Sequence, residues 1–217
     1  MTCVYYDNVL HEINYYHEIE YSSLHREGDE PAYIDENGSK IWYKNGLKHR
    51  GGDLPAYINS DGSKIWYKNG QKHRGGDLPA IINADGSKFW YKNGQPHRNG
   101  DEPAEIYAYG SKYWYKNGQV HREGDEPAVI HASGSKSWYK NGQLHRDGDK
   151  PAIIYANGCK FWFKNGKKYI NFNLIKLIST QLFLIFMFNI KKNKQSFHPD
   201  YLTGKLIKQD LFKLFEK

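Results

Sequence analysis

The sequence predicts an all-β repeat protein: an elongated antiparallel β-meander of stacked 24-residue hairpins with a short helical C-terminal tail. Three observations support this fold class. All six tryptophans are spaced by 24 residues. Each copy holds two short runs of aromatic and β-branched residues, bounded by turn residues such as Asn-Gly. Aromatic residues make up 16% of a chain that is only 39% hydrophobic, which favours β-structure with a thin core over a helical bundle.

Several other elements keep the same register as the tryptophans. Lys-Asn-Gly follows each Trp, His-Arg recurs six times from His25 to Arg146, and Gly-Asp-x-Pro-Ala recurs between Gly28 and Ala152. Chance does not produce this register, so the repeat is set by the sequence itself. We place three segments: a degenerate N-terminal cap at 1–24, six repeats at 25–170 and a hydrophobic, then basic tail at 171–217.

Each unit is predicted to be one β-hairpin. In the first copy, strands are expected at 32–35 and 40–44, joined by Asn37-Gly38, because such pairs tolerate the positive φ of a tight turn. A second turn at 44–46 ends the second strand, and Pro31 opens the first, where a missing N–H is tolerated. Lone hairpins are marginal in water, so stacked neighbours must supply the stability.

Alternation in the second strand places Trp42 on one face and Ile41 and Tyr43 on the other. We expect the invariant Trp to face the more tightly packed side, with the stems of Lys40 and Lys44 lying along it. Aromatic residues of the sheet are our candidate binding residues: Trp42, Trp66, Trp90, Trp114, Trp138, Trp162, Tyr43, Tyr67, Tyr91, Tyr115 and Tyr139.

The spacing Trp42-x-x-Asn45-Gly46-x-x-His49 resembles that of MORN-type repeats, whose units match Trp, Gly and His in this order. Arg50 stands where that family usually has Gly, and the Gly-Asp-x-Pro-Ala element is an addition, so the chain resembles a MORN variant similar to repeat proteins of large DNA viruses. The resemblance covers about residues 25–170. It implies an extended antiparallel sheet used for protein or lipid-membrane contact, without catalytic residues.

No catalytic residue, metal site, cofactor or small-molecule substrate is predicted. The histidines of successive repeats would lie about 10 Å apart, because two strands separate them, and zinc ligands must lie about 2 Å from one ion. Each His-Arg precedes an Asp, as in Arg50 and Asp53, and we interpret this as a turn-stabilising hydrogen bond or ion pair.

The net charge of +7 is interleaved with Asp and Glu in every repeat, which is typical of a solvated surface. Stacking of single-stranded nucleic acid on the aromatic residues is the weaker interpretation, since acids share the same strip. The two cysteines, Cys3 and Cys159, form no disulfide framework. Residues 1–10 lack the pattern of a signal peptide. We therefore expect an intracellular protein, in the host cytoplasm if it is viral.

The repeat register stops after Lys168, and residues 177–190 carry no charge. This run is shorter than the roughly 20 residues of a spanning helix. Three interpretations stay open for the tail: a helix docked on the open sheet end, a short membrane anchor, or a tail not selected for structure. Residues 205–217 have the pattern of a short amphipathic helix.

The function predicted from the sequence is a non-enzymatic scaffold that binds a protein partner along an extended β-sheet. The first alternative is a membrane-associated repeat protein, held through residues 172–192 and their flanking lysines. The second alternative is nucleic-acid binding.

Overall fold

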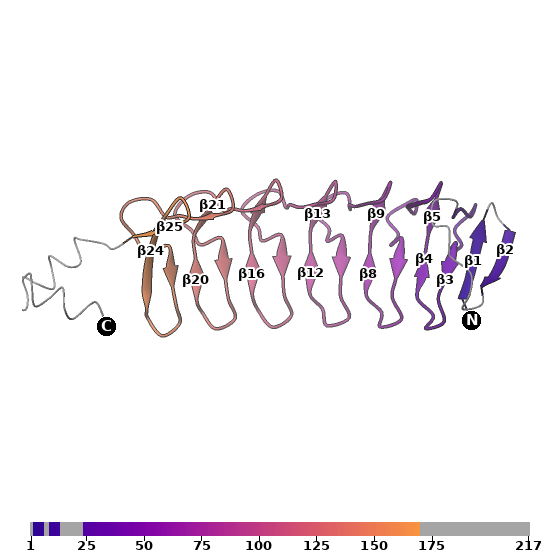
Figure 1. Cartoon of the computed structure of the whole chain (residues 1–217), viewed down its shortest axis with the longest axis horizontal. Coiled ribbons are helices and arrows are strands. Elements are labelled where there is room, and N and C mark those ends of the chain that lie inside the picture. Colours follow the sequence, from indigo (N-terminus) through magenta and orange to yellow (C-terminus); the bar gives the residue numbers. More distant parts are fainter. Residues whose placement is uncertain (1, 7–8, 14–23, 170–217) are drawn as a thin grey trace, which may run out of the picture. The chain divides into compact units, whose positions relative to one another are not determined.

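The computed structural model describes residues 2–6, 9–13 and 24–169. In the described part all regular structure is β, and the 24-residue units follow one another in a row (Figure 1). The predicted all-β antiparallel meander is therefore confirmed. The expected helical tail at 171–217 lies outside the described residues, and so do residues 14–23 of the expected N-terminal cap.

The main sheet receives two strands from each repeat, and every pairing in it is antiparallel. Within a repeat the two strands form a hairpin, and the second strand pairs with the first strand of the next repeat. The strands are β3 (Tyr33–Ile34), β4 (Lys40–Ile41), β7 (Tyr57–Ile58), β8 (Lys64–Ile65), β11 (Ile81–Ile82), β12 (Lys88–Phe89), β15 (Glu105–Ile106), β16 (Lys112–Tyr113), β19 (Val129–Ile130), β20 (Lys136–Ser137), β23 (Ile153–Ile154) and β24 (Lys160–Lys164).

At the N-terminal end, β1 (Thr2–Tyr6) and β2 (Val9–Ile13) form a hairpin that extends this sheet, because β1 pairs with β3.

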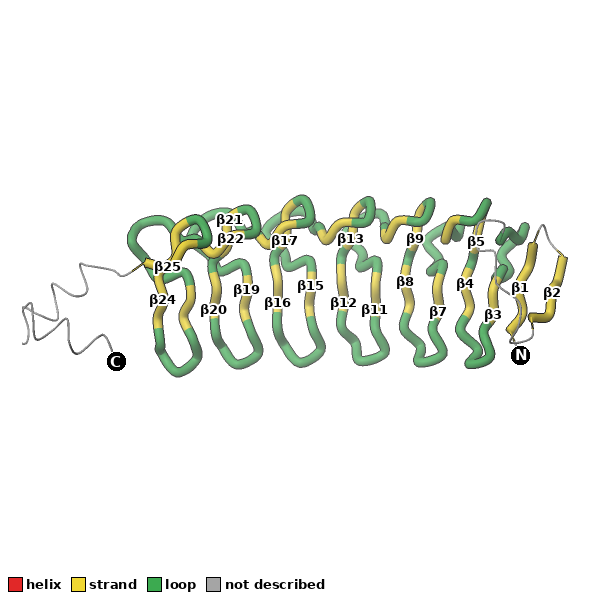
Figure 2. The backbone as a smooth tube through the Cα atoms, in the orientation of Figure 1, coloured by secondary structure: helices red, strands yellow, loops and turns green. Residues whose placement is uncertain are grey.

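A second, smaller hairpin follows the first in every repeat, beside one end of the main-sheet strands (Figure 2). These hairpins are β5 (Tyr43–Lys44) with β6 (Leu47–Lys48), β9 (Tyr67–Lys68) with β10 (Gln71–Lys72), β13 (Tyr91–Lys92) with β14 (Gln95–Pro96), β17 (Tyr115–Lys116) with β18 (Gln119–Val120), β21 (Tyr139–Lys140) with β22 (Gln143–Leu144), and the end of β24 with β25 (Lys167–Tyr169).

The expectation of a single hairpin per unit was therefore wrong in detail. The strand predicted at 40–44 is divided at Trp42 into β4 and β5. The backbone N–H of Trp42 donates to the carbonyl of Ala56 in the next repeat, while its own carbonyl accepts from His49 N–H. The chain thus changes hydrogen-bonding partner at the Trp, so the residues on either side belong to different sheets.

The tight two-residue turn is the second of the two predicted turns, not the first. Asn45 and Gly46 both have positive φ, at 50° and 69°, and Lys44 pairs directly with Leu47, which defines a two-residue type I′ turn. At the expected site, Asn37 is not in the positive-φ region, and only Gly38 is. Gly38 N–H donates to the carbonyl of Asp35, so this loop is a type I turn followed by a left-handed glycine.

Two in-register rows of residues cross the main sheet, one on each face, because neighbouring residues in a strand point to opposite sides. One row alternates strictly between half-buried Ile and exposed Lys, from Ile34 and Lys40 to Ile154 and Lys160. The other, which we call the aromatic–aliphatic row, comprises Tyr33, Ile41, Tyr57, Ile65, Ile81, Phe89, Glu105, Tyr113, Val129, Ser137, Ile153 and Phe161.

Among the described residues, no helix is long and apolar enough to span a bilayer. The segment 172–192, on which the membrane alternative rests, lies outside those residues.

Candidate binding surface

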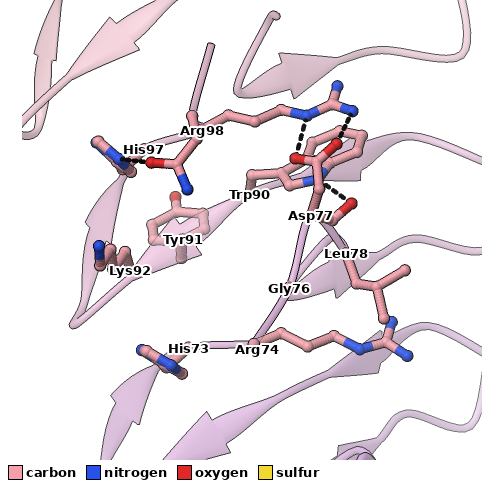
Figure 3. Close-up of a pocket in the computed structure, with 12 residues that line it drawn as sticks. His73, Arg74, Gly76, Asp77, Leu78, Trp90, Tyr91, Lys92, His97 and Arg98 are labelled. Carbon is pink, nitrogen blue, oxygen red and sulfur yellow. Dashed lines mark hydrogen bonds and ion pairs between the residues drawn. The ribbon is translucent and has the colours of Figure 1, made fainter.

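Successive repeats are joined by a clasp of three residues, shown for one junction in Figure 3. The Arg98 guanidinium donates to both carboxylate oxygens of Asp77, at 2.8 and 2.6 Å. It also lies 4.0 Å from the ring centroid of Trp90. Trp90 Nε1 in turn donates to the backbone carbonyl of Asp77 at 3.2 Å. A planar cation over an indole, bidentate on a carboxylate, is an arrangement that Arg makes and Lys does not.

The same clasp recurs at five junctions. In each case Arg covers a Trp eight residues earlier and binds an Asp 21 residues earlier: Arg50 with Trp42 and Asp29, Arg74 with Trp66 and Asp53, Arg98 with Trp90 and Asp77, Arg122 with Trp114 and Asp101, and Arg146 with Trp138 and Asp125.

Two predictions are corrected by this geometry. The carboxylate bound by Arg50 belongs to Asp29 of the preceding linker, not to Asp53 three residues later. The cation over Trp42 is Arg50, whereas Lys40 and Lys44 are exposed. Both corrections have one cause: Arg reaches back across the junction between repeats, and a local pattern cannot show a contact between distant residues.

The clasp lowers the pKa of its carboxylates. Hydrogen bonding to the Arg side chain holds the pKa of Asp29, Asp53, Asp77 and Asp101 below the ordinary value. The pKa of Asp125 falls furthest, to about 2, because Arg146 and then Lys150 both donate to it. These carboxylates therefore stay charged over most of the acidic range.

The histidines form a second link between repeats. The backbone N–H of Asn45 donates to Nδ1 of His25, and Asn69, Asn93, Asn141 and Asn165 do the same to His49, His73, His121 and His145. A backbone N–H only donates, so in His25, His121 and His145 Nδ1 is the acceptor and the ring proton sits on Nε2. At His49 and His73 the Oδ1 of Asn69 or Asn93 also lies 2.9 or 3.0 Å from Nδ1. The ladder of histidines thus holds the turn of one repeat against the linker of the repeat before it.

The predicted binding residues divide into two groups. Trp42, Trp66, Trp90, Trp114 and Trp138 are 6–7% exposed and lie beneath the arginines, so they form the core of the junctions. Trp162 is half-buried, and Tyr169 follows it where other repeats have His. Of the tyrosines, Tyr43 is buried and the others are half-buried: Tyr67, Tyr91, Tyr115 and Tyr139.

The half-buried tyrosines adjoin the aromatic–aliphatic row. The Lys48 ammonium lies 5.7 Å from the ring centroid of Tyr57, in the row, and 5.4 Å from that of Tyr67, in β9. Lys72 lies over Tyr91 in the same way, at 5.1 Å. At Lys48, therefore, a tyrosine of a second hairpin, Tyr67, and a ring of the row, Tyr57, meet the same ammonium group. The sequence identified the tyrosines but not the row, because the row exists only in the pairing of strands from different repeats.

Glu105 is the one carboxylate in the row. It is 8% exposed and accepts a hydrogen bond from the Tyr107 hydroxyl at 3.1 Å. Burial raises its pKa, which the hydrogen bonds from Tyr107 and Tyr115 offset in part. The pKa of Tyr107 rises to about 12, first through burial and then through the Glu105 charge. Other repeats have Tyr, Ile or Val here, so Glu105 distinguishes the fourth repeat from the rest.

Cavities open on the linkers between consecutive repeats. One of about 320 Å³ lies between the linker from His49 to Leu54 and the hairpin that holds Tyr67 and Lys68. Equivalent cavities of about 200 and 390 Å³ lie one and three repeats further along.

A scan against protein-family models finds no match, and no curated protein matches the sequence.

Proposed function

We propose that this chain is a non-enzymatic repeat scaffold that binds a protein partner along its β-sheet. The observation that carries the proposal is the aromatic–aliphatic row, a single line of in-register side chains that crosses six repeats. Ten of its twelve positions are aromatic or aliphatic, and tyrosines of the second hairpins flank it. Aromatic residues are enriched in the cores of protein interfaces, whereas charged ones are depleted.

The two sheet faces differ in a way that supports a protein partner on one of them. On the opposite face every second position is an exposed Lys, and such a face is well solvated. No lysine occupies a position of the aromatic–aliphatic row, which is half-buried for most of its length, and the ammonium groups of Lys48 and Lys168 reach over two of its rings from other strands. A catalytic role is not part of the proposal, because each repeat presents a closely similar set of side chains, and a catalytic site needs one distinct constellation. The MORN resemblance agrees with such a scaffold.

Affinity capture with the full-length chain tests the proposal, provided that the two faces are compared. The row variant F89S/Y113S changes two half-buried rings, and the control K88S/K112S changes their exposed neighbours in the same strands. Thermal melting establishes that both variants are folded. We expect a captured protein to be lost with the row variant and kept with the control.

Three other outcomes would refute a protein scaffold that uses the row: equal capture by both variants, capture that nuclease abolishes, or retention on lipid vesicles alone. The second supports nucleic-acid binding, and the third supports membrane association.

A further inference from the structure

Each linker cavity is lined by its clasp Asp, but the cavities differ in whether a further carboxylate follows the His-Arg pair. In the cavity of about 390 Å³, Asp147 lies 2.8 Å from His145 Nε2 and 3.3 Å from the Lys140 ammonium. One repeat earlier, Glu123 lies 3.2 Å from His121 Nε2 and 2.5 Å from Lys116, but only the contact with Lys116 is a hydrogen bond. Asp147 thus bridges a Lys and a His through hydrogen bonds to both.

In the cavity of about 320 Å³, both equivalent positions are glycine. Gly51 and Gly75 stand where Glu123 and Asp147 stand in the cavity of about 390 Å³, and Lys68 and His73 stand where Lys140 and His145 do. Among the described residues, no carboxylate lies within ion-pair distance of the Lys68 ammonium. We call this the Gly51–Gly75 cavity.

Neither glycine is required by the backbone. Gly51 and Gly75 are outside the positive-φ region, and a Cβ placed on either would meet no atom within 4 Å. By contrast, the next residue in each linker, Gly52 or Gly76, does have positive φ, at 65° and 68°. The two open glycines therefore leave space in the cavity without any conformational need for it.

The donors of the Gly51–Gly75 cavity are arranged as in the filled one. Asn93 contacts Nδ1 of His73 with its backbone N–H at 3.2 Å and with its Oδ1 at 3.0 Å. Both contacts use Nδ1, and the other ring nitrogen, Nε2, corresponds to the one through which His145 meets Asp147. Lys68 is exposed, so its ammonium is accessible to a ligand.

Charge and exposed apolar surface indicate what would occupy the space. Residues 49–96, the two repeats around the cavity, carry seven Lys and Arg against four Asp. Leu54 lines the cavity and is 43% exposed; Leu78 holds the same position one repeat later, and the remaining linkers have Glu or Lys. An acidic side chain next to an apolar one fits both features.

We propose that the Gly51–Gly75 cavity binds an Asp or Glu side chain of an acidic, Leu-containing segment of the partner protein. The partner carboxylate bridges Lys68 and His73, as Asp147 bridges Lys140 and His145 within the chain, and the neighbouring apolar side chain packs on Leu54. This rests on the proposed scaffold function and specifies the chemistry of the partner.

Fluorescence anisotropy with the full-length chain and a labelled peptide of Glu, Leu and Ser tests the proposal. We expect K68Q to weaken binding by about tenfold or more, because a charge-assisted hydrogen bond is lost. The matched control K140Q removes the same charge from the filled cavity and should leave the affinity unchanged. G75D should block binding by supplying an internal carboxylate, whereas G75A should not.

Other outcomes would overturn the proposal. Equal weakening by K68Q and K140Q would show that only net charge attracts the peptide. Unchanged binding by G75D, or equal binding of a peptide with Gln for each Glu, would show that no carboxylate enters the cavity. Tighter binding of a phosphoserine version, with competition by inorganic phosphate, would assign the cavity to phosphate instead. Protein capture that depends on the row but not on Lys68 would leave the scaffold function standing and refute this inference alone.

Discussion

Arg98 and Asp77 are 21 residues apart in the chain, yet they form a two-point ion pair over the indole of Trp90. Arg98 also donates to the carbonyl of Pro103 at 3.3 Å, so one side chain binds two consecutive linkers and covers the core residue between them. Because stability in repeat proteins comes from contacts between neighbours, this clasp is the contact most directly open to mutagenesis.

Loss of the whole Arg side chain of a clasp should destabilise the fold by more than loss of its ion pair with Asp alone. We expect R98A to lower the free energy of unfolding by about 1–3 kcal/mol, since a cation–π contact and several hydrogen bonds are lost together. R98K should recover only part of this, because Lys cannot bind Asp77 at two points while it covers Trp90. Urea denaturation of wild type, R98A, R98K, D77N and R98A/D77N measures the coupling, and a coupling of zero would contradict the clasp.

The tryptophans should differ in how much they contribute to the stability of the fold, according to whether an arginine covers the indole. W90A removes a buried indole and should cost about 3–5 kcal/mol, as large-to-small core substitutions do. W162A should cost clearly less, because Trp162 is half-buried and no clasp arginine follows it. Thermal melts followed by circular dichroism compare the two, and equal losses would show that the arginine cover adds nothing.

Acid should weaken the junctions in a defined range of pH. The pKa of Asp125 is about 2 in the folded chain, below its ordinary value of 3.8. The clasp therefore stabilises the fold fully above about pH 4, and this contribution is lost as the pH falls through 2. Melting temperatures measured from pH 5 to pH 2 should fall for wild type. D125N should already melt lower at pH 7 and show a shallower fall, and parallel curves would contradict this assignment.

The pH dependence of stability that comes from Glu105 should have the opposite sign to that from Asp125. Burial raises its pKa, so the ionised form disfavours folding, and the cost grows as the pH rises above the ordinary value of 4.5. We expect E105Q to melt at a higher temperature than wild type at pH 7 and at nearly the same temperature at pH 4. The control E126Q changes an exposed carboxyl and should show no such dependence. A lower melting temperature for E105Q at pH 7 would mean that the hydrogen bonds from the tyrosines outweigh burial.

Substitution by alanine should have different effects on the free energy of unfolding at two glycines. Gly94 has φ of 79° in a type I′ turn, where a Cβ is strained, so G94A should destabilise by about 1–2 kcal/mol. Gly75 lies outside that region with open space around it, so G75A should be neutral or stabilise by about 0.4–1 kcal/mol through the unfolded chain. Equilibrium unfolding of both variants decides this, and a destabilised G75A would show a structural need for glycine there.

The sequence alone determined the repeat, its β-class and the approximate position of its turns. Trp42 and its counterparts fix the period, and Asn-Gly, Asp-Gly and Pro mark where strands end, since these signals are local and need only a few residues. The antiparallel meander followed from them, because a hairpin that cannot bury its face alone must pair with the next.

Only the tertiary structure decided which residues meet across a junction. In the folded chain the predicted strand is divided at Trp42, and Arg50 forms its ion pair with Asp29 instead of Asp53. The tryptophans lie beneath arginines. The fold also brings Phe89 beside Glu105, and Tyr113 beside Val129, in one row. The physical reason is that these contacts join residues from different repeats, and their partners are chosen by how the linkers pack in three dimensions, about which local residue patterns carry no information.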